Sequence, residues 1–84
     1  MKHLKRLANV DQLRVGILII EHGILAEITY RTDEGIKIKT IKTNTERDAK
    51  PGLIPLKQIQ DAIDQAEHEI FIIGLKEDNP EYYL

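Results

Sequence analysis

Histidine is the side chain best suited to acid–base chemistry and metal binding near neutral pH, and the chain has three of them. His3, His22 and His68 stand at no helical or turn spacing from one another, so a metal cluster would need the fold to bring distant residues together. His22 precedes Gly23 in a turn signal. His68 falls at the end of an expected helix, where a cation meets the negative end of the helix dipole. We therefore expect local structural roles for these residues and no metal site.

The sequence offers few candidate residues for nucleophilic or acid–base catalysis. The chain has no serine and no cysteine, and its threonines lie on or beside expected strands, where threonine is a good strand former. Asp61 and Asp64 are one helical turn apart, and Glu67 is followed two residues later by Glu69. A general acid–base pair needs a pocket that separates its two pKa values, whereas these carboxylates fall on or beside the expected wet face of a helix. We predict no catalytic residue and no cofactor, and hence a protein that is not an enzyme.

Size and composition indicate one small folded domain. The 84 residues suffice for a single domain, 1–84, and 42% of them are hydrophobic, with few aromatic residues and many isoleucines, which favour sheet. The lack of cysteine excludes disulfides and favours a cytoplasmic location. The apolar stretch Ile17–Ile20, which no other apolar stretch exceeds in length, is far too short to cross a membrane, so we expect no membrane partner.

Three segments in the first half of the chain predict an antiparallel meander. Residues 14–21 are apolar enough for a strand that is covered on both faces. Residues 24–32 alternate between apolar and polar side chains, as a half-buried strand does. A hairpin loop at 33–35 leads into a third strand over 36–43. In this third strand Ile41 breaks the alternation, which indicates either a bulge nearby, at Thr40, or a twist toward a second contact surface.

The rest of the chain predicts two helices, a loop, one more strand and a tail. Residues 2–9 have two leucines three apart and could form a short helix, whereas residues 44–54 have no periodicity and predict an exposed loop. Residues 55–68 carry apolar residues at spacings of three, four and three, which is typical of an amphipathic helix. Residues 69–76 predict a last buried strand, and 77–84 a polar tail that ends in two tyrosines and a leucine. The predicted fold class is therefore α+β, in the order α-β-β-β-α-β.

Residues 10–43 carry a pattern found in small β-barrels. Leu13, Val15 and Gly16 form a Leu-x-Val-Gly entry to the first strand, and the turn signals His22-Gly23 and 33–35 separate the strands that follow. This segment resembles the opening of small SH3-like barrels, including short phage and bacterial proteins. The resemblance implies a partly open SH3-like barrel that acts as a binding module in protein or nucleic-acid settings. The long helix near the end departs from a minimal barrel of this kind.

The second half of the chain suggests a surface for another protein. Eight acidic groups follow residue 60, counting the terminal carboxylate, against one lysine, so the domain is expected to have an acidic side. A dense acidic helix face could dock on a basic surface, and terminal aromatic residues either fold back on the core or mark a contact with another chain. The partner-binding candidates are Asp61, Asp64, Gln65, His68, Tyr82, Tyr83 and Leu84.

The first half suggests a nucleic-acid surface as the alternative. Lysines alternate along the third expected strand, and an arginine lies on its hairpin partner, so a positive stripe could meet phosphates. Lysine on an exposed strand is also a common protection against edge-to-edge aggregation, and the net charge of -2 is opposite to that of a strongly basic binder. The candidate residues are Arg31, Lys37, Lys39 and Lys42.

Taken together, the sequence predicts a small non-enzymatic protein-binding module. We expect it to modulate a larger partner as an inhibitor or adaptor, and its small size and the barrel resemblance suggest a phage or other mobile element as its source. Nucleic-acid binding through the lysine-bearing strand is the alternative. An edge strand, either the last strand or the third, could also pair across a two-fold axis to form a homodimer.

Overall fold

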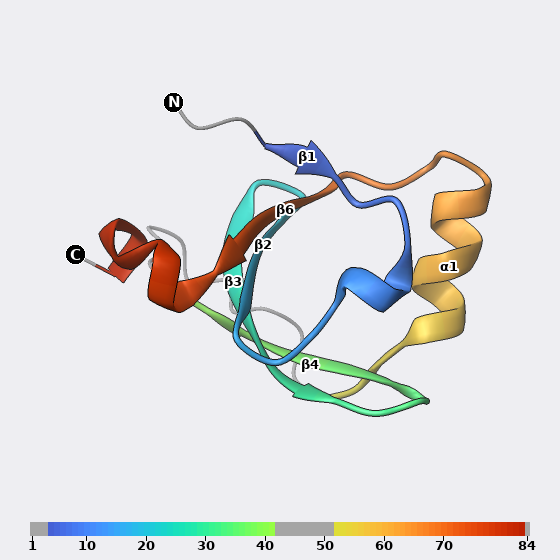
Figure 1. Cartoon of the computed structure of the whole chain (residues 1–84). Coiled ribbons are helices and arrows are strands. Elements are labelled where there is room, and N and C mark those ends of the chain that lie inside the picture. The colour runs from blue at the N-terminus through green and yellow to red at the C-terminus, as the bar shows by residue number, and fades with distance from the viewer. Residues whose placement is uncertain (1–3, 42–51, 84) are drawn as a thin grey trace.

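The computed structural model describes residues 4–41 and 52–83, which fold into one antiparallel sheet and one α-helix (Figure 1). The six strands are hydrogen-bonded in the order β1-β6-β2-β3-β4-β5. The sheet curls but stays open, so the predicted α+β class is confirmed and the barrel does not close. The elements in chain order are β1 (Lys5–Arg6), η1 (Val10–Gln12), β2 (Ile17–Glu21), β3 (Ile24–Arg31), β4 (Gly35–Thr40), β5 (Ile54–Pro55), α1 (Leu56–Asp64), β6 (Ile70–Leu75), η2 (Lys76–Asp78) and η3 (Pro80–Tyr83).

The prediction of a short helix over residues 2–9 is wrong for the residues of this segment that the structure describes. Lys5 and Arg6 instead form β1 at an edge of the sheet, opposite Ile72 and Phe71 of β6. Leu7, which follows, is buried in the core, and its amide donates to the Ile70 carbonyl. A helix of about two turns is marginal on its own, so pairing with β6 and burying Leu7 decides the conformation.

The predicted meander β2-β3-β4 is confirmed, and a bulge changes its alternation. His22 and Gly23 both have positive φ, 48° and 82°, as the two central residues of a type I′ hairpin turn require. Ala26 and Ile28 are buried and point inward, but the register with β4 shifts between Ile28 and Tyr30. The extra residue is Thr29 on β3, so the bulge is not near Thr40 on β4, where the sequence suggested it.

The main core lies between the inner face of the curled sheet and α1. The helix is shorter than the predicted 55–68: it begins after β5 and ends at Asp64. Ile54, at the end of the predicted loop, belongs to β5, and the rest of that loop up to residue 51 lies outside the described residues. The buried residues of this core are Leu7, Leu13, Ile19, Ala26, Ile28, Ile36, Ile54, Leu56, Ile59 and Ile70.

The outer face of the sheet is covered by the end of the chain. Leu18 is fully buried but is not part of the main core, and its register partner on β3 is Glu27. Cross-strand partners share a face, so Leu18 and Glu27 both point to the outer side of the sheet. The 3₁₀ turns η2 and η3 lie on the side opposite α1 (Figure 1) and contact Glu27 through Lys76 and Tyr83. In the described ranges no helix is long and apolar enough to span a membrane.

Candidate partner-binding site

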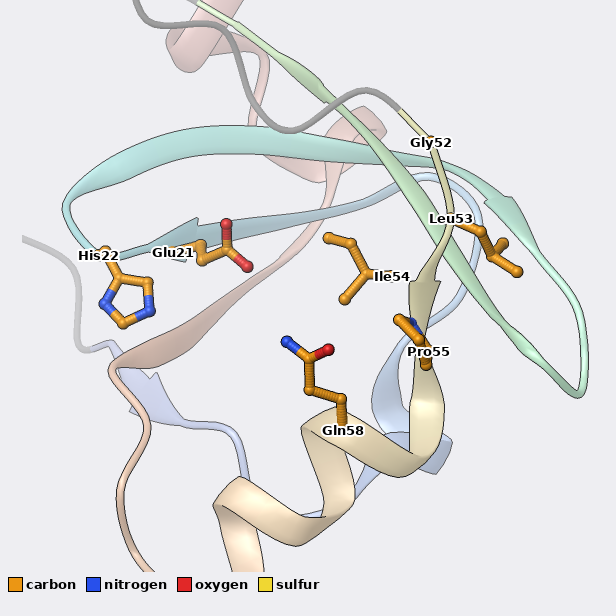
Figure 2. Close-up of a pocket in the computed structure, with 7 residues that line it drawn as sticks. All are labelled: Glu21, His22, Gly52, Leu53, Ile54, Pro55 and Gln58. Atoms are coloured by element: carbon orange, nitrogen blue, oxygen red, sulfur yellow. The ribbon is translucent and has the colours of Figure 1, made fainter.

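A cavity of about 320 Å³ opens between the β2-β3 turn, β5 and the first turn of α1 (Figure 2). One wall is largely apolar and comes from the segment before the helix, where the side chain of Ile54 points into the cavity. The opposite wall is polar and comes from the end of β2. The lining residues are Glu21, His22, Gly52, Leu53, Ile54, Pro55 and Gln58.

Backbone contacts hold both walls of this cavity in place. The amide of His22 donates to the carbonyl of Glu69, which fixes the β2-β3 turn against the start of β6. On the other side, Gly35 of β4 pairs with Pro55 of β5. A Cβ at Gly35 would lie only 2.3 Å from the carbonyl oxygen of Ile54, so this close approach of the two strands requires glycine.

Glu21 enters the cavity because of strand geometry. Side chains two apart on a strand share a face, and Ile19 and Glu21 of β2 therefore both point to the inner side. Ile19 is buried in the core, whereas Glu21 lies at the rim and is half-buried. Figure 2 shows its carboxylate directed into the space that faces Ile54 and Gln58.

The polar side chains around the cavity have no partner among the residues that the structure describes. In the described part of the chain, the side chains of Glu21, His22 and Gln58 form no hydrogen bond or ion pair with one another or with other residues. Within the described ranges, no other residue occupies the donors and acceptors that water or a ligand would use. This set has one full negative charge, from Glu21, beside an amide and an imidazole, so its chemistry suits a cationic ligand that donates several hydrogen bonds.

The predicted acidic face of the helix adjoins this cavity. Asp61, Asp64 and Gln65 are all exposed on or just after α1, as expected. Asp64 accepts a hydrogen bond of 2.9 Å from the amide of Gln60. Gln58 lies one helical turn before Asp61, so both side chains project from the same side of α1. The cavity and the acidic face form one continuous stretch of surface.

His68 does not belong to that surface, and the predicted helix-end role is wrong. The helix ends four residues earlier, and His68 is only 5% exposed. Its Nδ1 accepts a 3.2 Å hydrogen bond from the Ile70 amide, while the guanidinium of Arg6 donates to its carbonyl oxygen. Burial, and then the positive charge of Arg6, lower the pKa of His68, so the ring is a neutral acceptor in the turn before β6.

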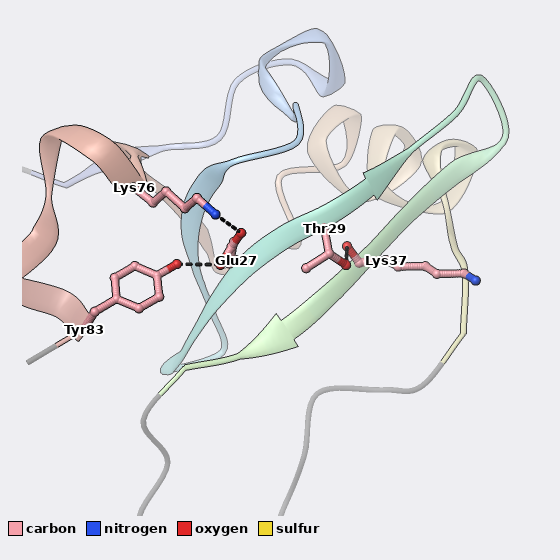
Figure 3. A network of polar contacts seen from close by, with 5 residues as sticks. All are labelled: Glu27, Thr29, Lys37, Lys76 and Tyr83. Atoms are coloured by element: carbon pink, nitrogen blue, oxygen red, sulfur yellow. Dashed lines mark hydrogen bonds and ion pairs between the residues drawn. The ribbon is translucent and has the colours of Figure 1, made fainter.

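The described part of the tail, up to Tyr83, lies on the other face of the molecule from the cavity. The hydroxyl of Tyr83 and the ammonium of Lys76 both bind the carboxylate of Glu27 (Figure 3). Tyr82 is half-buried, and Leu84 lies outside the described residues. Two outcomes were considered for the terminal aromatic residues, and Tyr83 shows the first: it folds back on the domain.

The three predicted nucleic-acid residues that the structure describes do not form a free positive stripe. The half-buried guanidinium of Arg31 donates to the backbone carbonyls of Val10, Leu13 and Thr32. Lys39 is the cross-strand partner of Glu27, and its positive charge helps to lower the pKa of that carboxyl. Lys42 lies outside the described residues.

Lys37 is the remaining member of the basic set. Its ammonium lies 5.1 Å from the centre of the ring of Tyr30, which is 46% exposed. This cation–π pair is the one described place where a base could stack beside a positive charge. Metal binding has no comparable site, since the described residues contain no group of three or more histidine, aspartate or glutamate side chains that could hold an ion.

Sequence reasoning missed the cavity, although it contained one usable signal. Glu21 ends a strand that is otherwise apolar, on the same parity as the half-buried Ile17 and the buried Ile19. A carboxylate on the inner face of a small domain is a functional candidate, because burying a charge without a partner is costly. The helix residue Gln58 and the segment before α1 gave no such signal. They meet Glu21 only through the tertiary fold.

Comparison of the chain with protein-family models, with curated proteins and with solved structures gives no match. Its function is therefore inferred from its own residues and geometry.

Proposed function

We propose that this protein is a small binding module that docks a basic segment of a larger partner protein along α1 and the adjoining cavity. The observation that carries the proposal is the carboxylate of Glu21, half-buried, directed into a cavity and without a partner in the described residues. The exposed Asp61 and Asp64 extend the negative surface beyond the cavity. Opposite charges across such a surface steer association and fix its register.

The apolar side of the cavity adds what an electrostatic patch lacks. Ile54 and Pro55 line this side, close to Gln58. Interfaces combine an apolar contact with a polar surround, and the combination gives more affinity than exposed ion pairs alone. Lys57 neighbours Gln58 in the chain but does not line the cavity. The module needs no catalytic step, and the lack of cysteine supports a cytoplasmic setting.

Nucleic-acid binding has weaker support. Arg31 is engaged by backbone carbonyls and Lys39 faces Glu27, which leaves the pair of Tyr30 and Lys37 as the described remnant of the stripe. One stacked tyrosine with one lysine neutralises few phosphates, so any such binding would be weak and would vanish at physiological salt.

A peptide array tests the proposal directly. The purified full chain is applied to an array of random 12-residue peptides at low and at physiological salt. We expect retained peptides to be enriched in arginine and lysine, with weaker retention as salt rises. Retention without enrichment in basic residues, or no retention at low salt, overturns the proposal.

Two double variants locate the surface. D61N/D64N removes two negative charges from α1, and D33N/E34Q removes two from the exposed β3-β4 turn, so the total charge change is equal. We expect the first variant to lose at least fivefold in affinity for a retained peptide and the second to change it less than twofold. Equal losses in the two variants would mean that net charge, not this surface, binds the peptides.

A further inference from the structure

We infer that the cavity receives an arginine side chain of the basic segment, with Glu21 as its counter-charge. This inference rests on the proposed function and names the group that the partner presents. The cavity, of about 320 Å³, lies at the lower end of the range for ligand sites and suits one long side chain better than a folded ligand.

The two walls match the two parts of an arginine side chain. Ile54 and Pro55 provide an apolar surface for the aliphatic stem. The carboxylate of Glu21 lies across the cavity from them, where the charged end of such a side chain would arrive (Figure 2). A stem against Ile54 and Pro55 and a charge against Glu21 define the orientation of the bound side chain.

The number and placement of acceptors favour a guanidinium over an ammonium. Glu21 offers two carboxylate oxygens, Gln58 an amide oxygen and His22 a ring nitrogen, and these come from two separate elements. A guanidinium has five N–H donors in one plane and binds a carboxylate with two parallel hydrogen bonds. An ammonium is a compact point charge that reaches fewer separated acceptors and is more strongly hydrated.

Other occupants fit less well. An anion would be repelled by Glu21, and a metal ion would find only Glu21 and His22 as ligands of the usual kind in the cavity lining. Within the described residues, Arg6 and Arg31 bind backbone carbonyls elsewhere and do not line the cavity.

The test uses small probes, so that it does not depend on knowing the partner. N-acetyl-arginine amide, N-acetyl-lysine amide and N-acetyl-citrulline amide are titrated into the isotope-labelled full chain, and amide chemical shifts are followed. Citrulline has the shape of arginine without its charge. We expect saturable shifts at His22, Ile54 and Gln58 with the arginine probe, at least threefold weaker binding of the lysine probe, and none of the citrulline probe. Equal shifts with arginine and citrulline overturn the inference.

Variants connect the binding to Glu21. E21Q keeps the size of the side chain and removes its charge, and E34Q does the same at an exposed turn. We expect E21Q to lower the affinity for the arginine probe at least tenfold and E34Q to change that affinity less than twofold. Thermal unfolding shows that both variants are folded. Unchanged binding in E21Q contradicts the assignment.

The experiment also separates this inference from the proposed function and from an occupant within the chain. If basic peptides bind, and D61N/D64N lowers their affinity while E21Q does not, the docking function stands and the arginine pocket fails. If the arginine probe binds but no basic peptide does, the proposed function fails and the pocket stands.

Arg47 and Lys50 precede the cavity in the sequence, so the titration is repeated on R47Q/K50Q. Binding in that variant alone would assign the cavity to a cation of this chain and overturn the inference.

Discussion

The hydroxyl of Tyr83 donates a 2.5 Å hydrogen bond to the carboxylate of Glu27, 56 residues earlier in the chain (Figure 3). The ammonium of Lys76 lies 3.1 Å from the second oxygen of the same carboxylate. Glu27 is only 13% exposed and shares the outer face of the sheet with the buried Leu18. The end of the chain is therefore part of the folded domain, and its contacts have measurable consequences.

Removing the Tyr83 hydroxyl should loosen this end of the chain. A hydrogen bond to a charged acceptor contributes about 1.5–3 kcal/mol, and partial exposure reduces that range, so we expect Y83F to lower the free energy of unfolding by about 1 kcal/mol. Urea denaturation measures the change. Y30F is the control, because the exposed Tyr30 contacts Lys37 through its ring. Equal stability of Y83F and the wild type would show that the hydrogen bond contributes nothing.

The same bond predicts behaviour at high pH. Burial, and then the hydrogen bond to Glu27 and its negative charge, raise the pKa of Tyr83 to about 12, from an ordinary value of 10.0. A group whose pKa is raised on folding stabilises the fold below its unfolded pKa and loses that effect as pH rises through the folded one. The stability difference between wild type and Y83F should thus disappear between about pH 10 and pH 12. Tyrosinate absorbance of the two proteins gives the titration of Tyr83 by difference, and a midpoint at the ordinary value would contradict the bond.

Glu27 predicts the opposite dependence at low pH. The hydrogen bond from Tyr83 is the largest influence on its pKa, and together with Lys76 and Lys39 it outweighs burial, so the pKa of Glu27 lies below 4.5. A group whose pKa is lowered on folding stabilises the fold at pH values above its unfolded pKa, and this stabilisation is lost as the pH falls through its folded pKa. We expect E27Q to cost about 1–2 kcal/mol at pH 7, and the difference from wild type to shrink below about pH 4.5. E34Q, an exposed glutamate, should show no such dependence; a pH-independent loss in E27Q would rule out charge as the cause.

Strand patterning made much of the fold predictable from the sequence. The apolar run before the His22-Gly23 turn, the alternation after it and the amphipathic period before His68 were sufficient for the meander and α1. The segment near Lys5 was misassigned because two residues of strand carry no period, and only the edge of β6 decides their conformation. Local pattern is informative where many residues repeat it, and fails where one distant partner determines the outcome.

The candidate site was less predictable, for two physical reasons. The bulge at Thr29 reverses the parity of β3, which turns Arg31 inward to backbone carbonyls and removes it from the predicted positive stripe. The cavity joins Glu21 to Gln58 across 37 positions, a contact that no local spacing encodes. The exposure of Asp61 and Asp64, which depends on helical period alone, was predicted correctly.

The inward position of Arg31 gives a prediction of its own. Its guanidinium holds the carbonyls of Leu13 and Val10 near η1, and a lysine ammonium cannot reproduce the planar fork that does so. We expect R31K to lose about 1–3 kcal/mol of stability, whereas R14K, at an exposed arginine in the turn before β2, should change it by less than about 0.5 kcal/mol. Urea denaturation of both variants measures this. A stable R31K would show that Arg31 is held only loosely.

The C-terminal end of α1 offers a stabilising substitution. Ala66 has φ of 56°, in the left-handed region, and the amides of Ala66 and Glu67 donate to the carbonyls of Ile63 and Ala62, which is the Schellman pattern that usually ends in glycine. A non-glycine residue in the left-handed conformation destabilises the fold by about 1–2 kcal/mol, and glycine removes this strain. Glycine also makes the unfolded chain more flexible, which offsets part of the gain. We therefore expect A66G to raise the free energy of unfolding by about 0.5–1 kcal/mol.

The matched control places the same substitution inside the helix. Ala62 lies within α1, where glycine should lower the stability by about 1 kcal/mol, so the two alanine-to-glycine variants are expected to shift the urea midpoint in opposite directions. Because both changes delete the same methyl group, the difference in sign isolates the backbone conformation as its cause. If A66G is destabilising as well, residue 66 does not adopt the left-handed conformation, and the helix does not end in the turn that leads His68 into its buried position before β6.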